Sequence, residues 1–174
     1  MEFSFLYGIP RGSVLDAFFL GVTKVAGSYG QIWVIIALLL LVFKKTRRAG
    51  VSLLIAYVGV FLVGQLGLKN LISRPRPCQI DTAFPLLVAR PFSSSFPSTH
   101  SAWAFAGATA IFLRHKKAGI AAYVAAILIG FSRLYLFLHF PTDVLIGAGM
   151  GVVLGILADR ITGVAEKKIQ QGNG

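Results

Sequence analysis

Long apolar runs alternate with short polar breaks along this chain, and the longest are residues 32–43, 51–68 and 118–138. A helix that crosses a membrane needs roughly 20 mainly apolar residues. The pattern therefore predicts an all-α integral membrane protein, a bundle of five or six transmembrane helices. The predicted spans are residues 31–43, 50–68, 98–113, 118–138 and 142–157.

Residues 13–27 form a shorter apolar segment that Asp16 and Lys24 interrupt. A helix of this length extends only about 22 Å, whereas the hydrocarbon core of a bilayer is about 30 Å thick. Two interpretations fit this segment. It is either an amphipathic helix that lies at the outer membrane interface or a short first span.

The composition supports a membrane protein, because 56% of the 174 residues are hydrophobic and only 13% are charged. A soluble domain usually has about 25% charged residues. The length suits a single domain. We expect an N-terminal segment at residues 1–30, a transmembrane core at residues 31–160 and a cytoplasmic tail at residues 161–174.

The net charge of +11 is concentrated in short basic segments at residues 44–48, 114–117 and 160–168, next to the ends of apolar runs. This distribution predicts cytoplasmic loops under the positive-inside rule, and the chain has no sequence-specific nucleic-acid motif. The single Cys78 excludes an internal disulfide and a cysteine-based metal cluster. The remaining cations fall mostly on the opposite, non-cytoplasmic side.

Residues 132–143 place Arg133, His139 and Asp143 in a very apolar region. Charged side chains near a bilayer centre are energetically costly and usually functional. Because Phe140 precedes Pro141, it disfavours helical dihedrals, so the fourth span should end near residue 138 or 139. Asp143 would then reach back to one ring nitrogen of His139 and leave the other nitrogen free to attack.

Two further segments bring polar groups to the same predicted side. Residues 69–77 contain Lys69, Arg74 and Arg76 next to two prolines, and arginine matches the geometry of phosphate oxygens. Attachment to lipid headgroups is the alternative for this segment. Residues 96–101 begin a helix that Ser98 or Thr99 can cap, and free N–H groups at a helix start bind anions. His100 lies in the first turn of that helix.

The chain has only six acidic residues, and of these only Asp81 and Asp143 are expected near these groups. A two-metal phosphatase needs more oxygen ligands than that. The sequence therefore predicts that Lys and Arg side chains, without a metal or another cofactor, neutralise a phosphate group that is transferred through a histidine.

The spacing of these residues resembles the type 2 phosphatidic acid phosphatase (PAP2) superfamily of lipid phosphatases, in its compact bacterial branch. Three family motifs match in order: Lys69 with Arg76-Pro77, Pro97-Ser98-Thr99-His100, and Ser132-Arg133 with His139 and Asp143. The resemblance covers about residues 30–160. Thr99 departs from the pattern, because the family has glycine there.

The resemblance implies a role for each matched residue. His139 would be the nucleophile that forms a phosphohistidine, and Asp143 would orient it. His100 would protonate the leaving oxygen and later activate water. The phosphoryl group would be held by Lys69, Arg76, Ser98, Thr99 and Arg133, with Arg74 as an auxiliary candidate outside the motif.

The resemblance further implies a multi-pass protein of the cytoplasmic membrane whose site faces the outside or periplasm. The expected substrates and partners are lipid phosphates: undecaprenyl diphosphate, favoured by the resemblance alone, phosphatidylglycerol phosphate or phosphatidic acid. A lipid A phosphatase, an anion transporter and a protein that binds lipid phosphate without turnover are the alternatives. The oligomeric state is not predicted.

Overall fold

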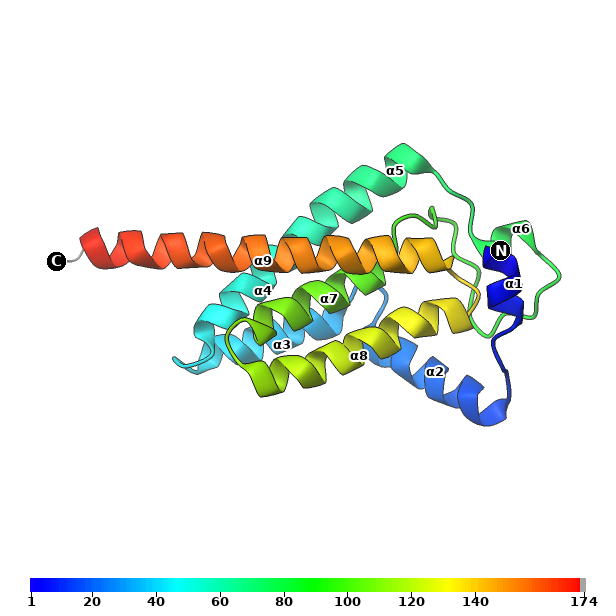
Figure 1. The fold of residues 1–174 in the computed structure, drawn as a ribbon, viewed down its shortest axis with the longest axis horizontal. Coiled ribbons are helices and arrows are strands. Elements are labelled where there is room, and N and C mark those ends of the chain that lie inside the picture. The colour runs from blue at the N-terminus through cyan, green and yellow to red at the C-terminus, as the bar shows by residue number, and fades with distance from the viewer. Residues whose placement is uncertain (173–174) are drawn as a thin grey trace.

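The computed structural model describes residues 1–172, which contain helices and no strands (Figure 1). The chain runs from a short N-terminal helix to a long C-terminal helix that passes along one side of the bundle. The helices are α1 Glu2–Tyr7, α2 Ser13–Ala26, α3 Gln31–Val42, α4 Arg47–Val60, the π-helix η1 Phe61–Leu68, α5 Lys69–Ile72, α6 Pro77–Ile80, α7 Thr99–Phe112, α8 Lys116–Tyr135 and α9 Pro141–Gly172.

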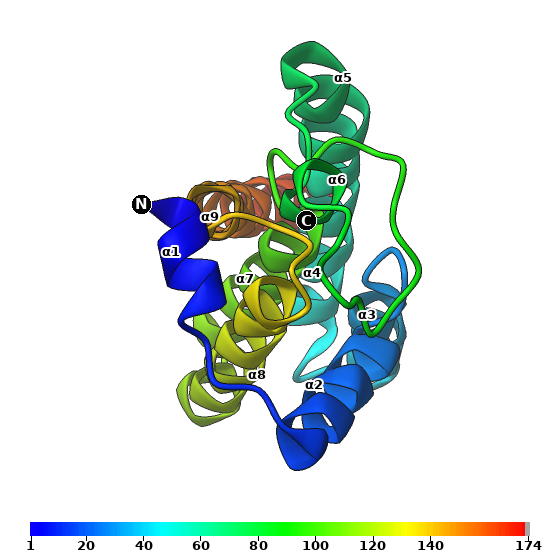
Figure 2. The same cartoon turned by 90° about the vertical axis from the view of Figure 1, so that its right-hand side faces the viewer.

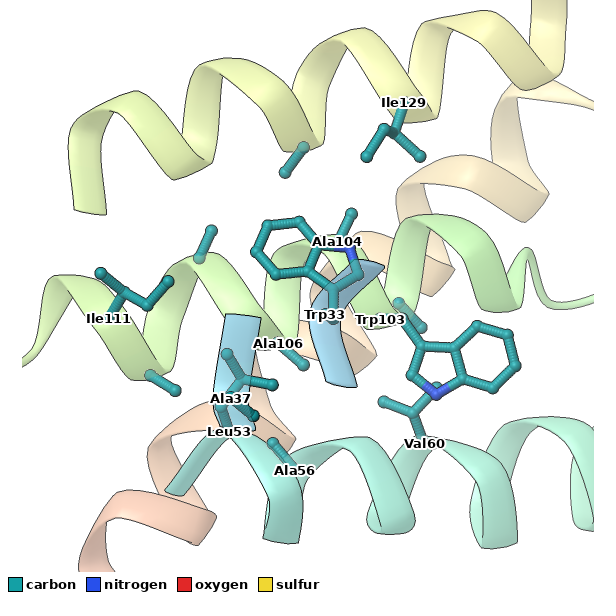
Figure 3. Packing of buried hydrophobic residues seen from close by; sticks show 14 of the residues in the cluster. Trp33, Ala37, Leu53, Ala56, Val60, Trp103, Ala104, Ala106, Ile111 and Ile129 are labelled. Atoms are coloured by element: carbon teal, nitrogen blue, oxygen red, sulfur yellow. The ribbon is translucent and has the colours of Figure 1, made fainter. Parts of the chain in front are cut away.

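Helix α7 lies in the middle of the bundle, in contact with α4, α8 and α9 (Figures 1 and 2). Its buried residues are mainly alanines, whose small side chains allow neighbouring helices to approach closely. Trp33 of α3 and Trp103 of α7 fill the larger spaces of this core (Figure 3). A Cβ atom on Gly107 would lie 2.3 Å from the Trp33 ring, so a glycine is required there.

Glycines also determine how α9 packs against α7. Added Cβ atoms on Gly147 and Gly151 would lie 2.4 and 2.3 Å from the backbone oxygens of Ser98 and Ala102. Gly155 meets α7 in the same way, whereas Gly149 has nothing within 4 Å. Helix α9 thus packs closely against α7 through a face with a four-residue period, and Gly149 lies off that face.

Three helical segments are long and apolar enough to cross a membrane: residues 47–80, 116–135 and 141–171. Helices α2 and α3 together meet the same criterion as a pair bent by 53°. Helix α7 has only 14 residues and is surrounded by the others. The chain is therefore a multi-pass, all-α membrane protein, and residues 13–26 form one arm of a bent pair, which neither prediction for this segment included.

Several predicted helix ends were wrong. Helix α8 ends at Tyr135 rather than near residue 138, because Phe137 adopts a left-handed φ of 59°, which a helix cannot contain. The second span continues past Lys69 to Ile72 and ends where Ser73 has a φ of 39°. Left-handed residues therefore end both helices next to the predicted site.

Helix α9 continues far beyond the predicted end at residue 157. Residues 161–172 are helical and follow the preceding turn without a break, so the structure shows no boundary at residue 160. Alanine, glutamate, lysine and glutamine, which favour helices, make up much of this segment. Residues 173–174 of the predicted tail lie outside the described residues.

The two ends of the bundle differ in their polar groups. One end, which we call the basic end, contains the predicted cytoplasmic segments, and there Arg114 and Arg48 contact Asp159 and Glu166 of α9. The other end, which we call the cavity end, contains α1, α6 and the link between α8 and α9, and it faces the viewer in Figure 2.

Candidate active site

A cavity of about 550 Å³ lies at the cavity end, between α2, α7, the loop that follows α6 and the link between α8 and α9. Five cationic side chains and two histidines line it, and no aspartate or glutamate of the described residues does. The cations are Lys24, Lys69, Arg76, Arg90 and Arg133, and the histidines are His100 and His139. A cavity of this composition suits an anion.

His139 lies in the short link between α8 and α9, where the backbone N–H groups of Leu138 and His139 donate to the carbonyl of Arg133. The imidazole is almost completely buried, and its Nε2 lies 3.0 Å from Nη1 of Arg76. A guanidinium can only donate, so Nε2 accepts and the ring proton of a neutral imidazole is on Nδ1. The Nε2 lone pair therefore points toward the cations.

The pKa of His139 agrees with this neutral state. Burial is the largest cause that lowers the pKa of the imidazole far below its usual value, and the neighbouring Arg76 and Lys69 lower it further. Because the group is uncharged at neutral pH, Nε2 keeps its lone pair. A neutral imidazole is the form that acts as a nucleophile.

Asp143 does not hydrogen-bond to His139 as predicted. Its Oδ2 lies 3.7 Å from Nδ1 of His139, and Nδ1 has no hydrogen-bond partner. Oδ2 instead accepts from the hydroxyl of Ser95 and from the backbone N–H of Phe140, 2.8 Å away. These two donors hold the carboxylate beside the ring but draw Oδ2 out of hydrogen-bonding range of Nδ1.

Arg76 is held by the loop that covers the cavity. Its Nε donates to the carbonyl of Ser93 at 2.8 Å, and Nη2 donates to the Ser93 hydroxyl and the Ser94 carbonyl. Its Nη1 donates to the carbonyl of Leu138 at 2.9 Å. These bonds fix the guanidinium next to the Nε2 atom of His139 without any carboxylate.

The other two motif cations are also buried, Lys69 at 6% and Arg133 at 3% exposure. Arg133 donates from Nε and Nη2 to the hydroxyl of Ser132, at 3.1 and 2.9 Å, and from Nη2 to the hydroxyl of Thr23. Within residues 1–172, neither side chain forms an ion pair with a carboxylate. Both cations therefore line the cavity with their charge uncompensated.

His100 lines the cavity from the first turn of α7, where its Nε2 lies 3.0 Å from the carbonyl oxygen of Gly27. Ser98 is the N-cap of this helix, and its hydroxyl accepts from the backbone N–H of Ser101. Thr99, which replaces the family glycine, packs its methyl group toward Gly64 and donates to Gln65 at 3.3 Å. The absence of a side chain at Gly64 makes room for this threonine.

Arg74 lies outside the cavity, behind His139. Its Nη1 donates to Oδ1 of Asp143 at 2.6 Å and its Nη2 to Glu2 at 2.6 Å, while the guanidinium stacks on the ring of Phe140 at 4.2 Å. Glu2 also accepts from the backbone and hydroxyl of Thr142. The auxiliary candidate thus contacts the carboxylate side of the site and not the cavity.

Sequence reasoning missed several polar residues that support the site. Ser93 and Ser95 belong to a serine run between prolines, whose turn-forming composition was the only signal. Thr23 and Glu2 are far from every motif in sequence and have no signal. Because Thr23, Lys24 and Glu2 contact or line the site, residues 1–30 belong to the same structural unit as the predicted core.

Within residues 1–172, no group of three or more His, Cys, Asp or Glu side chains is arranged to hold a metal ion. The predicted residues His100, His139, Lys69, Arg76, Thr99 and Arg133 line one cavity. Ser98 and Asp143 are fully buried directly behind it, joined by a bond from the N–H of Ser98 to the carbonyl of Asp143. The three separate motifs thus meet at one place.

Comparison with known proteins points to the same family as the motifs. Residues 45–165 match the family model of the PAP2 superfamily. An undecaprenyl-diphosphatase of Sulfolobus acidocaldarius is 31% identical over 87% of this chain and 75% of its own, and the undecaprenyl-diphosphatase BcrC of Bacillus subtilis is 28% identical over 92% and 82%. The crystal structure of a PAP2-type phosphatidylglycerolphosphate phosphatase from Bacillus subtilis superimposes with a TM-score of 0.69 and 34% identity, over 90% of this chain and 79% of that one. This chain therefore belongs to the PAP2 superfamily of membrane lipid phosphatases.

Proposed function

We propose that this lipid phosphatase hydrolyses an isoprenyl diphosphate such as undecaprenyl diphosphate. Two relatives that match most of the chain are named for that activity. Phosphatidylglycerol phosphate, which the name of the structural neighbour specifies, is the main competing substrate. Both lipids have an anionic phosphate headgroup, which the cations of the cavity would neutralise.

The observation that carries the mechanism is the position of Nε2 of His139 among cations at the cavity wall. In the first step, the Nε2 lone pair attacks the terminal phosphorus, an N–P bond forms, and the bond from phosphorus to the leaving oxygen breaks. The product of this step is a phosphohistidine. Asp143 balances the positive charge that the imidazole gains.

We assign both proton transfers to His100. It gives a proton to the leaving oxygen in the first step, then takes one from the water that attacks the phosphohistidine and releases phosphate and free His139. Since Nε2 of His100 faces the carbonyl of Gly27, these transfers use Nδ1 or require the ring to turn away from Gly27. No step requires a metal ion.

We propose that the developing negative charge is stabilised from three directions. Lys69 and Arg76 come from the segment of α5 and α6, Arg133 comes from α8, and the first turn of α7 supplies backbone N–H groups. Donors that are already fixed need little rearrangement as the charge develops. The phosphate-binding set is Lys69, Arg76, Ser98, Thr99 and Arg133.

We further propose that the basic end faces the cytoplasm of the cell membrane and the cavity end faces the outside or periplasm. The distribution of Lys and Arg supports this orientation, since the short segments at residues 44–48 and 114–117 lie at the basic end. A site in this position acts on lipid headgroups of the outer leaflet.

Phosphate release from detergent-solubilised protein tests the substrate and the nucleophile together. The lipids are undecaprenyl diphosphate, phosphatidylglycerol phosphate, phosphatidic acid and lipid A, and wild type is compared with His139→Ala. We expect the highest kcat/KM for undecaprenyl diphosphate. We expect a loss of at least about 1,000-fold in His139→Ala, because no other group replaces the nucleophile.

Excess EDTA is the matched control for a metal-dependent reaction, and it should leave the rate unchanged. An active His139→Ala variant or full inhibition by EDTA would contradict the mechanism. A higher kcat/KM for phosphatidylglycerol phosphate than for the isoprenyl diphosphate would contradict the substrate and leave the mechanism standing.

A further inference from the structure

Two of the five cations that line the cavity belong to none of the three family motifs. Lys24 is in the last turn of α2, and Arg90 is in the loop between α6 and α7. Lys24 precedes the first motif and Arg90 lies between the first and second motifs. The roles of the motif residues therefore do not explain why these two cations line the cavity. Their charge adds to that of Lys69, Arg76 and Arg133 in a cavity without a carboxylate.

The charge exceeds what a single phosphate group needs. A phosphate monoester has a charge of about −1.5 to −2 at neutral pH, and the three motif cations supply +3. Two further positive charges in the same cavity suit a ligand with a second phosphate group. Cations without partners repel one another, so an anion that enters the cavity relieves this repulsion and is bound favourably.

The position of Lys24 in the membrane fold strengthens this argument. It lies just before the bend of the α2–α3 pair, in the sequence Val22-Thr23-Lys24-Val25. Ionisable residues in spanning segments are costly and usually functional. A lysine at a helix C-terminus is stabilised by the helix dipole, but that stabilisation does not require the side chain to line a cavity.

Contacts of neighbouring residues locate Lys24 on the leaving-group side of the site. Its carbonyl accepts from the N–H of Gly27 at 3.2 Å, and the carbonyl of Gly27 contacts His100 at 3.0 Å. The residue before it, Thr23, accepts from Arg133. Since His139 attacks phosphorus from the opposite side to the leaving oxygen, a group bonded to that oxygen lies toward His100 and the last turn of α2.

We propose that Lys24 binds the second phosphate group of a diphosphate lipid, the one that stays with the lipid. When Nε2 of His139 takes the terminal phosphorus, the bond to the bridging oxygen breaks and the lipid monophosphate leaves with a proton from His100. The ammonium of Lys24 balances the charge of that monophosphate before and after the step. This subsite rests on the proposed substrate and names the residue that selects it.

The test compares wild type with Lys24→Gln on an isoprenyl diphosphate and on the monophosphate with the same tail. The variant should lower kcat/KM for the diphosphate by about 10- to 100-fold, since a charged hydrogen bond is lost. The kcat/KM for the monophosphate should stay within about 3-fold. Lys24→Arg keeps the charge and should restore most of the loss.

Arg90→Gln is the matched control, because it removes a cation from the same cavity in a different segment, the loop after α6, where Arg90 donates to the carbonyl of Thr82. It should lower both activities equally, as a general electrostatic effect does. The assignment would be overturned if Lys24→Gln lowered kcat/KM equally for both substrates. It would also be overturned if Arg90→Gln changed the ratio of the two kcat/KM values as much as Lys24→Gln does.

A second measurement separates the subsite from the proposed substrate. Inorganic pyrophosphate and inorganic phosphate are tested as inhibitors of whichever lipid phosphate the protein hydrolyses. Lys24→Gln should raise the inhibition constant of pyrophosphate about 10-fold and leave that of phosphate unchanged. If wild type fails to hydrolyse the isoprenyl diphosphate, the proposed substrate is wrong, and the pyrophosphate result still decides the subsite: no change overturns it.

Discussion

The two ends of the bundle use arginine in opposite ways. At the basic end, Arg114 donates from Nε and Nη2 to the two carboxylate oxygens of Asp159, at 2.6 and 2.5 Å. Arg48 contacts Glu166 at 2.9 Å. Each of these cations has an acidic partner on α9, so the pairs tie the helices together.

At the cavity end, Arg76 and Arg133 are more deeply buried than those arginines and donate only to neutral oxygens and a histidine. Burial of an unpaired charge is unfavourable. A folded protein that keeps such charges at a cavity wall is preorganised for an anion from outside the chain. The comparison shows that cations of the same type serve the structure where they are paired and the ligand where they are not.

The largest effect is expected for Arg133→Met, which roughly keeps the volume of the side chain and removes its charge. Arg133 contacts hydroxyl groups only, so the free energy of unfolding should not fall, and it rises if repulsion from Arg76 is relieved. The kcat/KM for lipid phosphate should fall by about 100- to 1,000-fold, the usual effect of removing a fixed donor to a developing anion. Phosphate release and the Tm in detergent measure the two effects.

A folded Arg133→Met variant that keeps more than about a tenth of the activity would contradict the claim that the unpaired cations of the cavity end bind the ligand. A large drop in Tm would contradict it as well, since it would show that Arg133 stabilises the fold. Lys117→Met, at the exposed basic end, is the control for the loss of one positive charge.

The same substitution at the other end, Arg114→Met, should have the opposite result. It leaves the carboxylate of Asp159 with only the hydroxyl of Ser52 at 3.5 Å and Arg48 at 3.9 Å. Because Arg114 is about a third exposed, we expect a loss of about 1–3 kcal/mol in the free energy of unfolding. The specific activity of the folded fraction should not change, which phosphate release measured below the Tm would show.

Much of the fold could be predicted because apolar runs and basic segments are local signals. The apolar runs predicted the membrane spans, and Pro141 predicted the start of α9. The end of α8 could not be predicted, since the left-handed turn at Phe137 depends on packing: Phe84 stacks on its ring at 3.9 Å. By contrast, the bend between α2 and α3 has a local signal, because it lies at Gly27 and Gly30, whose φ angles of 73° and 66° are ones that glycine favours.

The predictable part of the site is the part that the motifs contain. Their spacing brings His139, Arg76 and His100 to one cavity, but it does not show that Ser95 and Phe140 occupy the Asp143 oxygen expected to bind His139. Nor could it show the ion pair of Arg74 and Glu2, which are 72 positions apart. Contacts between distant residues appear only when the chain is folded.

Arg74 tests the comparison from within the cavity end, because it is paired with Glu2 and Asp143 as the arginines of the basic end are paired. We expect Glu2→Gln to lower kcat/KM by about 3- to 10-fold, since Arg74 then holds Asp143 less firmly and no contact with the phosphate is lost. The KM should not change. A loss as large as that of Arg133→Met would show that Arg74 and Glu2 belong with the unpaired cations.

The same variant gives the pH dependence of this pair. Burial raises the pKa of Glu2, but the hydrogen bonds from Thr142 and Arg74 outweigh it, so the pKa lies below the usual value of 4.5. A carboxylate with a lowered pKa stabilises the fold above its unfolded pKa and loses that contribution as the pH falls through its folded pKa. The Tm of wild type should therefore exceed that of Glu2→Gln at about pH 7, and the difference should shrink as the pH falls below 4.5. A difference that persists at acid pH would mean that the Glu2 charge is not what holds α1 against Arg74.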